Sequence, residues 1–431
     1  MRPVPTPSPT AGDMEWFVHD RFGMFIHWGL YAAAARHEWV KHHEEIPDDR
    51  YEKYFRHFDP DLFAPEDWAR MARRAGMNYV VLTAKHHEGF CLWDSQYTEY
   101  KATNTPCGRD LLRGVVDAFR AEGLRIGFYY SLIDWHHPDF TIDPMHPMRN
   151  HPDAKKWNAG RDMSRYRAYM RNQVRELLTN YGDIDVMWFD FSYPQADLNG
   201  LRGKGHEDWG SEELLAMVRA LRPGIIVDNR LDLPPDQADI HTPEQFQPDA
   251  WVMVDDKPVY WEACQTFSGS WGYHRDESSW KSPEQLIRML INTVSNGGNL
   301  LMNVGPTARG LFDDRAMDAL KAYADWMALN RRSILGCTQS EFEPPTDVRY
   351  TQRGDRLYAH VFAWPFKHLH LPGLAGKVAY AQLLHDASEV RILDAICPHQ
   401  EIRPREGAVV LELPVHKPRV TVPVIELFLK E

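Results

Sequence analysis

Short apolar segments alternate with amphipathic helical segments along most of this sequence, and this alternation restricts the fold more than any other feature. Seven segments rich in β-branched and aromatic residues read as strands: 23–29, 78–85, 125–131, 185–190, 224–229, 259–263 and 298–304. Some are continuous apolar runs, as expected when both faces of a strand are covered. The pattern predicts an α/β fold, a TIM-type (β/α)8-like barrel that need not be regular.

Two of the intervening helices are well marked. Between residues 162 and 181, apolar residues recur at three- and four-residue steps and form one buried stripe. Before the apolar run that starts at Leu286, Ser282 is placed as an N-cap, Pro283 takes the first helical position and Gln285 completes a capping box. We therefore expect a helix that begins at Pro283.

The chain of 431 residues divides into three parts. Residues 1–12 are rich in Pro, Ser and Thr and are predicted to be a disordered lead-in. Residues 13–337 carry the strand and helix alternation of the barrel. Residues 338–431 change to short alternating strands separated by Pro, Gly and Asp, which is typical of an antiparallel β-sandwich. We expect a catalytic barrel followed by a C-terminal sandwich domain.

Composition narrows the partners and the compartment. With 49 Lys and Arg against 61 Asp and Glu, the net charge of -12 makes nucleic acid an unfavourable partner. The five widely spaced cysteines predict neither a disulfide framework nor a zinc site, and no apolar run predicts a membrane span. The N-terminus lacks a signal-like apolar region, so a cytoplasmic protein is expected, although a chain trimmed of its signal would read the same. The composition allows a homo-oligomer but does not predict one.

Polar residues that end apolar strands are the candidates for chemistry, because working groups of parallel barrels lie at the carboxyl ends of the strands. Asp190 closes such a strand beside Trp188; its alternative role is an N-cap, which the loop-like residues after it disfavour. Most glycosidases need two carboxylates, and either Glu244 or Glu262 can supply the second. Glu244 can equally be a solvated loop charge, and Glu262 a structural partner of Arg230.

Histidines cluster in HWG, KHHEG and WHHP and allow a metal interpretation. Adjacent histidines on a strand point to opposite faces, and the spacing is not that of common zinc sites. Neutral imidazoles that hydrogen-bond sugar hydroxyls explain the same residues without a cation. We therefore expect neither a metal nor a cofactor.

The ordered set of motifs over about residues 16–310 closely resembles the α-L-fucosidase family of retaining glycoside hydrolases. These motifs are HWGLY, HEWV, AKHHEGFCLWDS, YYSLIDW, MWFD, the Asn-Arg pair at 229–230, HTPE, WE with SWGY, WKSPEQL and GGNLLMNVGPTARG. The resemblance implies a barrel followed by a β-sandwich, no metal, and Asp190 as the nucleophile. Glu244 matches the acid/base of some family members, and Glu262 matches the residue proposed for that role in others. The residues that match the fucose pocket are His27, Glu38, Trp39, His86, His87, Tyr130, Trp188, Arg230 and Trp271.

The expected activity is removal of terminal α-linked L-fucose from fucosylated oligosaccharides or glycoconjugates by double displacement. Glu88, Val40 and Phe191 depart from the family pattern of Asp, Tyr and Gly, so the linkage preference cannot be carried over. The alternatives are a glycosidase for an α-L-galactose-type sugar, metal-assisted hydrolysis through the histidines, and an inactive sugar-binding barrel.

Overall fold

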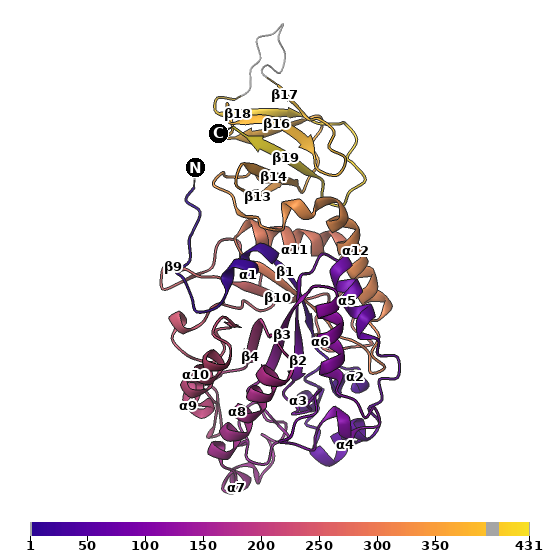
Figure 1. Ribbon diagram of the computed structural model, residues 1–431, viewed down its shortest axis with the longest axis vertical. Coiled ribbons are helices and arrows are strands. Elements are labelled where there is room, and N and C mark those ends of the chain that lie inside the picture. Colours follow the sequence, from indigo (N-terminus) through magenta and orange to yellow (C-terminus); the bar gives the residue numbers. More distant parts are fainter. Residues whose placement is uncertain (1, 394–404, 431) are drawn as a thin grey trace.

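The computed structural model describes residues 2–393 and 405–430, and its centre is a parallel sheet of seven strands (Figure 1). The strands lie in the order β10-β11-β1-β2-β3-β4-β7, each parallel to its neighbours. Their bounds are β1 Phe22–Ile26, β2 Tyr79–Lys85, β3 Arg125–Ser131, β4 Val186–Asp190, β7 Ile226–Val227, β10 Glu262–Thr266 and β11 Asn299–Val304. The predicted barrel followed by an antiparallel β domain is confirmed.

Helices cover the outside of the curled sheet, and Figure 1 shows α5, α6 and α8 along β2 and β3. The longer helices are α1 Met14–Asp20, α5 Pro65–Arg74, α6 Leu111–Ala121, α8 Met163–Asn180, α10 Ser211–Leu221, α11 Pro283–Ser295 and α12 Asp314–Asn330. Shorter ones lie in the loops: α2 Tyr31–Ala34, α3 Val40–His43, α4 Asp48–Arg56, α7 Ala154–Asn158 and α9 His206–Trp209. No helix within the described ranges is long and apolar enough to cross a membrane.

Helix α11 begins where its sequence predicts. The Ser282 side chain accepts the backbone N–H of Gln285, the Gln285 side chain accepts the backbone N–H of Ser282, and Pro283 opens the helix. The predicted helix over 162–181 is likewise present as α8, whose apolar stripe is buried.

Alternation along the strands separates two cores. Side chains that point inward fill the barrel: Phe25, Tyr79, Val81, Tyr129, Val186, Trp188, Ile226, Ile240, Cys264 and Leu301. Their neighbours along each strand point outward and pack beneath the helices. A polar residue that follows an inward-pointing aromatic at a spacing of two therefore faces the barrel mouth.

The barrel closes through an irregular segment, 239–245, which we call the seam segment. It lies between the edge strands β7 and β10 and makes isolated parallel bridges to residues 228, 261 and 264. Backbone hydrogen bonds run from Asp239 to Val227 on one side and between His241 and Glu262 on the other. The seam segment thus takes the place of an eighth strand, without a barrel helix packed outside it.

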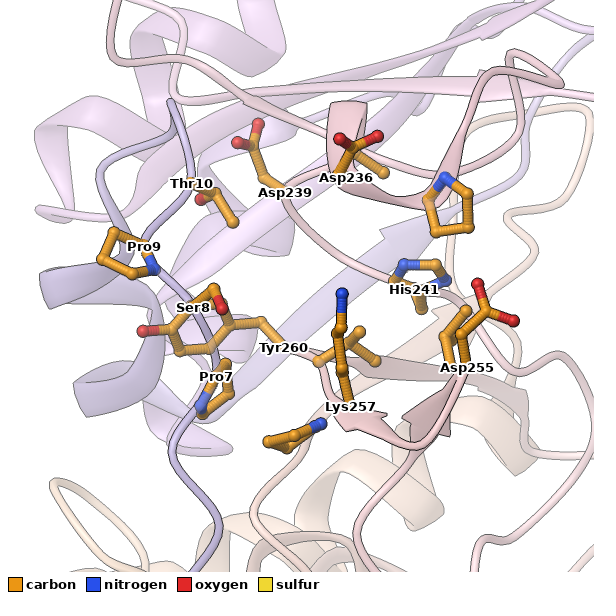
Figure 2. Close-up of a pocket in the computed structure, with 15 residues that line it drawn as sticks. Pro7, Ser8, Pro9, Thr10, Asp236, Asp239, His241, Asp255, Lys257 and Tyr260 are labelled. Carbon is orange, nitrogen blue, oxygen red and sulfur yellow. The ribbon is translucent and has the colours of Figure 1, made fainter.

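The seam is bordered outside by a hairpin and by the N-terminal residues. The hairpin is β8 (Met253–Val254) with β9 (Lys257–Pro258), and residues 7–10 pass opposite it. Between them is a hollow of about 880 Å³, which Figure 2 shows with Thr10, Asp239, His241 and Tyr260 around it. Residues 2–12 contain neither helix nor strand. That they are disordered in solution, and that the domains divide at 12 and 337, stay predictions.

The C-terminal domain is a pair of antiparallel sheets that share one apolar core. One sheet has the order β12-β13-β14-β19-β16 and the other the order β15-β18-β17. The bounds are β12 Thr338–Gln339, β13 Val348–Arg353, β14 Arg356–Val361, β15 His368–Pro372, β16 Val378–Leu383, β17 Arg391–Leu393, β18 Ala408–Glu412 and β19 Val424–Leu429. This domain sits next to α11 and α12 (Figure 1).

Candidate active site

A pocket opens where the carboxyl ends of the barrel strands meet, as expected for a parallel barrel. The space between its lining residues is about 310 Å³, which includes its opening to solvent. The lining residues come from strands β1, β3, β4 and β10, from the segments that follow β1, β2, β4, β7 and β10, and from the seam segment. They are Phe25, His27, Trp39, His86, His87, Tyr129, Trp188, Asp190, Phe191, Arg230, Glu244, Cys264 and Trp271.

Asp190 ends β4 with its side chain in this pocket. One carboxylate oxygen, Oδ1, lies 2.8 Å from Nη1 of Arg230, and Oδ2 accepts a hydrogen bond of 2.6 Å from the hydroxyl of Tyr129. Burial raises the pKa of Asp190, while Arg230 opposes that shift. The group is thus a buried carboxylate held in one orientation by two donors.

Glu244 shares the guanidinium that holds Asp190. Its Oε2 lies 2.7 Å from Nη1 of Arg230, the atom that also contacts Asp190. Because both oxygens contact one nitrogen, they lie at most about 5.5 Å apart, which fits the ~5–5.5 Å between carboxyl groups in retaining glycosidases. Glu244 is 41% exposed, so it stands at the mouth of the pocket.

Glu262 does not line the pocket, contrary to what its prediction as an acid/base candidate requires. The sequence placed it near the end of a strand over 259–263, but β10 begins at Glu262. The side chain therefore lies at the opposite end of the barrel, where its carboxylate accepts hydrogen bonds from Tyr79 and from the indole of Trp188. Burial raises the pKa of Glu262 to about 7. It has no contact with Arg230 among the described ion pairs.

His27 and His87 are held as neutral hydrogen-bond acceptors. Nδ1 of His27 lies 2.7 Å from the side-chain oxygen of Asn303, and Nδ1 of His87 lies 2.7 Å from Oγ of Ser131. Asn303 and Ser131 each donate to a backbone carbonyl, so both oxygens accept, and each Nδ1 carries the proton. Burial lowers the pKa of both histidines well below its usual value. Each Nε2 is therefore left as an acceptor, and that of His87 lies 3.8 Å from Oδ2 of Asp190.

His86 and the tryptophans complete the walls. His86 stacks on Tyr129 with 13° between the ring planes, and the guanidinium of Arg230 lies 4.5 Å from the ring centre of Trp188. Trp39 and Trp271 are half-buried at the mouth. These rings give the pocket apolar walls beside its polar floor, which suits a sugar with hydroxyls on one side and apolar C–H groups on the other.

Glu38 is adjacent to the pocket but does not line it, contrary to its prediction. Its carboxylate accepts the backbone N–H groups of Trp271 at 3.1 Å and Gly272 at 2.7 Å. Glu38 therefore holds the segment that carries Trp271.

Tyr130 was also predicted to line the pocket but does not. The pocket residue from this strand is its neighbour Tyr129, which the sequence analysis did not name. Tyr130 points outward beneath α8, where its hydroxyl donates to Gln173. In the register with β4, Tyr129 pairs with the inward-pointing Trp188. Side chains alternate between the two faces of a strand, and Ile126 and Phe128 are apolar residues that face the helices. Tyr130 is two residues further along, so the sequence already indicated that it faces the helices too.

Phe25, Phe191 and Cys264 also line the pocket and were not predicted. Phe191 follows the candidate nucleophile with φ of 91°, a region that favours glycine, so the backbone there is strained. Its ring contacts the rings of Trp39 and His87. The bulky side chain of Phe191 thus forms part of the pocket wall at the position where the family pattern has glycine.

The histidines are arranged for hydrogen bonding. Within residues 2–393 and 405–430, no group of three or more His, Cys, Asp or Glu side chains is placed to hold a metal ion. Cys91, Cys107, Cys264 and Cys337 are free thiols, and Cys397 lies outside the described residues.

A parallel barrel with a carboxylate pair at the mouth of a small pocket is the arrangement of a glycoside hydrolase. The family described as Alpha-L-fucosidase matches residues 7–332. The chain belongs to this α-L-fucosidase family.

Relatives match over nearly the whole chain. Human plasma alpha-L-fucosidase is 29% identical over 93% of this chain and 85% of its own. The structure of alpha-L-fucosidase isoenzyme 1 from Paenibacillus thiaminolyticus is 46% identical with a TM-score of 0.90, covering 97% of this chain and 99% of its own. A Bacteroides thetaiotaomicron alpha-L-fucosidase trapped as a covalent intermediate with 2-fluoro-fucosyl fluoride is 29% identical with a TM-score of 0.83, covering 99% and 98%. That intermediate supports a retaining mechanism for the family.

Proposed function

We propose that this chain is an exo-acting retaining α-L-fucosidase that releases terminal α-linked L-fucose from fucosylated glycans. The observation that carries the proposal is the single nitrogen of Arg230 in contact with both Asp190 and Glu244. It brings a buried carboxylate and a mouth-facing carboxyl group to the spacing of a nucleophile and an acid/base. The small pocket supports action on one terminal sugar.

The chemistry takes two displacements. Asp190 attacks C1 of fucose and forms an ester, while the bond from C1 to the leaving oxygen breaks and Glu244 gives that oxygen its proton. Glu244 then takes a proton from water as the water oxygen attacks C1. The ester bond breaks, Asp190 is a carboxylate again, and the two inversions give net retention.

Binding of the sugar follows from the pocket walls. The neutral His27 and His87 accept hydroxyl hydrogens, and His86 and Arg230 add further polar contacts. Trp271 and Phe25 offer apolar surface for the C5 methyl group. A pocket that pairs hydroxyls with buried acceptors discriminates steeply against sugars that lack them. Exclusion of an added hydroxyl, as in an α-L-galactoside, is expected to be weaker.

Replacement of the nucleophile tests the proposal. Asp190→Ala is expected to lower kcat/KM on an aryl α-L-fucoside by about a thousandfold or more. Azide should restore part of the activity and give fucosyl azide, because the vacated space admits a small nucleophile. Near-normal activity of this variant would exclude Asp190 as the nucleophile.

Product analysis tests the exo action and the sugar. Incubation of the wild-type protein with fucosylated oligosaccharides should release free fucose, and a panel of α-L-fucosides and α-L-galactosides should favour fucose. Release of larger fragments would contradict exo action, and no release of sugar would leave a binding protein on an inactive barrel.

A further inference from the structure

A second hollow borders the active pocket on the outer side of the seam segment. Its volume is about 820 Å³, and we call it the rim groove. It is lined by Asn229, His241, Thr242, Pro243, Phe246, Pro248, Asp249, Ala250, Trp251 and Val252. His241 also lines the hollow of Figure 2, which lies further along the same seam.

The rim groove and the active pocket share a thin wall. Two consecutive pairs along the chain, Asn229–Arg230 and Pro243–Glu244, each place their first residue in the groove and their second in the pocket. Thr242 lines the groove and accepts a hydrogen bond of 3.0 Å from Nε of Arg230. The carboxyl group of Glu244 therefore stands on the wall that separates the two hollows.

The lining has the chemistry of a neutral carbohydrate site. Phe246 is 64% exposed, and the indole N–H of Trp251 is fixed by a hydrogen bond of 2.9 Å to the carbonyl of Val259. These rings offer flat apolar surface, on which the C–H faces of sugars stack. An exposed phenylalanine in a hollow costs solvation unless a ligand covers it.

Polar groups are placed beside those rings. The side-chain oxygen of Asn229 accepts from both the backbone N–H and the hydroxyl of Thr242, so the amide nitrogen is turned outward as a donor. Asp249 is the one charged residue among the lining residues, and none of them is Lys or Arg. An anionic ligand is therefore disfavoured.

We propose that the rim groove binds the sugar residues on the leaving-group side of a neutral fucosylated oligosaccharide. The inference rests on the proposed function, since Glu244 must touch the glycosidic oxygen to protonate it. The first leaving sugar then lies on the wall, and the next sugars reach Phe246, two residues further along the chain. Longer neutral glycans are thus better substrates than short ones, and the gain comes from contacts with Phe246 and Trp251.

Substrate length is the variable that tests this inference. For the wild-type protein, KM is expected to fall from a fucosylated disaccharide to a neutral tetrasaccharide of the same linkage. A sulfated tetrasaccharide of equal length should gain less. Phe246→Ala should raise KM for the neutral tetrasaccharide by about threefold to tenfold. It should leave kcat/KM for an aryl fucoside unchanged, because that substrate ends before the groove, and Phe246→Tyr should restore the tetrasaccharide KM.

Phe366→Ala is the matched control, since Phe366 is 80% exposed on the C-terminal domain, away from the groove. This variant should leave both the tetrasaccharide KM and the aryl fucoside kcat/KM at their wild-type values. Equal tetrasaccharide KM values for wild type and Phe246→Ala would overturn the inference. An equal loss on aryl fucoside and tetrasaccharide would also overturn it, because the loop would then act through Glu244. Failure of the proposed function looks different: the wild-type protein would release fucose from no substrate.

Discussion

At the scale of single residues, Arg230 explains how two acidic groups coexist at the pocket. Its Nε and Nη2 atoms are anchored on Thr242, which fixes the fork, and Nη1 faces Asp190 and Glu244. A buried carboxylate without a cation tends to take up a proton, which would remove its nucleophilic character. The position of the guanidinium therefore sets both the spacing and the charge of the reacting pair.

Glu244 and Glu262 can be separated by leaving-group dependence. Glu244→Ala is expected to lower kcat/KM on a natural glycan by about 10²–10⁴-fold and to affect an aryl fucoside far less, because a good leaving group needs no proton. Glu262→Gln is the matched change at the other end of the barrel and should alter both substrates by the same factor. A larger glycan-specific loss in Glu262→Gln would reverse the assignment.

Glu262 also predicts a pH dependence of stability. Burial raises its pKa from 4.5 to about 7, so the folded state favours the protonated form. That stabilisation is fully present below about pH 4.5 and is lost as the pH rises through about 7. Relative to Glu262→Gln, wild type should therefore lose up to about 3 kcal/mol of unfolding free energy between pH 5 and pH 8.

Urea denaturation of the wild type and Glu262→Gln at both pH values measures this difference. Because every other titrating group is common to the two proteins, the change in their difference reports Glu262 alone. A difference that is the same at pH 5 and pH 8 would show that Glu262 does not titrate in this range.

Residue types at strand ends predicted much of the site, and strand bounds account for the errors. Asp190, His27 and Arg230 lie in the pocket because each follows a buried apolar run. Glu262 was misplaced because β10 starts three residues later than its apolar pattern indicated. The alternative role of Glu262, as a structural partner of Arg230, fails for the same reason.

At the scale of elements, the two faces of β3 give a paired test. Tyr129→Phe removes a donor to the Asp190 carboxylate, so the pKa of Asp190 should rise, and the acid limb of kcat/KM should move to higher pH with a lower kcat. Tyr130→Phe removes the hydroxyl that donates to Gln173 and should cost about 1 kcal/mol of stability without changing the pH profile. An unchanged acid limb in Tyr129→Phe would contradict the role of this hydrogen bond.

The seam segment is the element that the sequence did not reveal. Residues 239–245 read DIHTPEQ, in which Ile240 is the one large apolar residue and a proline interrupts the segment. Apolar and polar residues therefore do not alternate as they do in a strand. Their backbone bonds depend on β7 and β10, which are far away in sequence. Helix α11 is the opposite case, because its capping box is local and its first residue was predicted correctly. A helix start that depends on neighbouring residues could be predicted from the sequence, whereas backbone pairing between segments far apart in the chain could not.

At the scale of the whole molecule, the barrel and the C-terminal domain share apolar contacts. Val422, Val424 and Tyr358 of the C-terminal domain belong to the same buried cluster as the barrel helices. Arg332 pairs with Glu426 across this contact. No described residue beyond Trp271 lines the active pocket, so we expect the C-terminal domain to act on stability rather than on the chemistry.

Trp326 in α12 tests that division of roles. Its indole is buried and donates a hydrogen bond of 3.0 Å to the carbonyl of Val422 in the C-terminal domain. Trp326→Phe leaves that carbonyl unpaired and should lower the unfolding free energy by about 1–3 kcal/mol. Leu329→Ala, three residues along the same helix and 45% exposed in the wild type, should stay within about 0.5 kcal/mol.

Calorimetry and kinetics on the same preparations decide the outcome. The Tm of Trp326→Phe should fall by a few degrees, while kcat/KM on an aryl fucoside at 25 °C stays at the wild-type value, because the pocket lies wholly in the barrel. A parallel loss of activity would show that the C-terminal domain shapes the pocket. An unchanged Tm would show that the two domains are held together by contacts other than this indole.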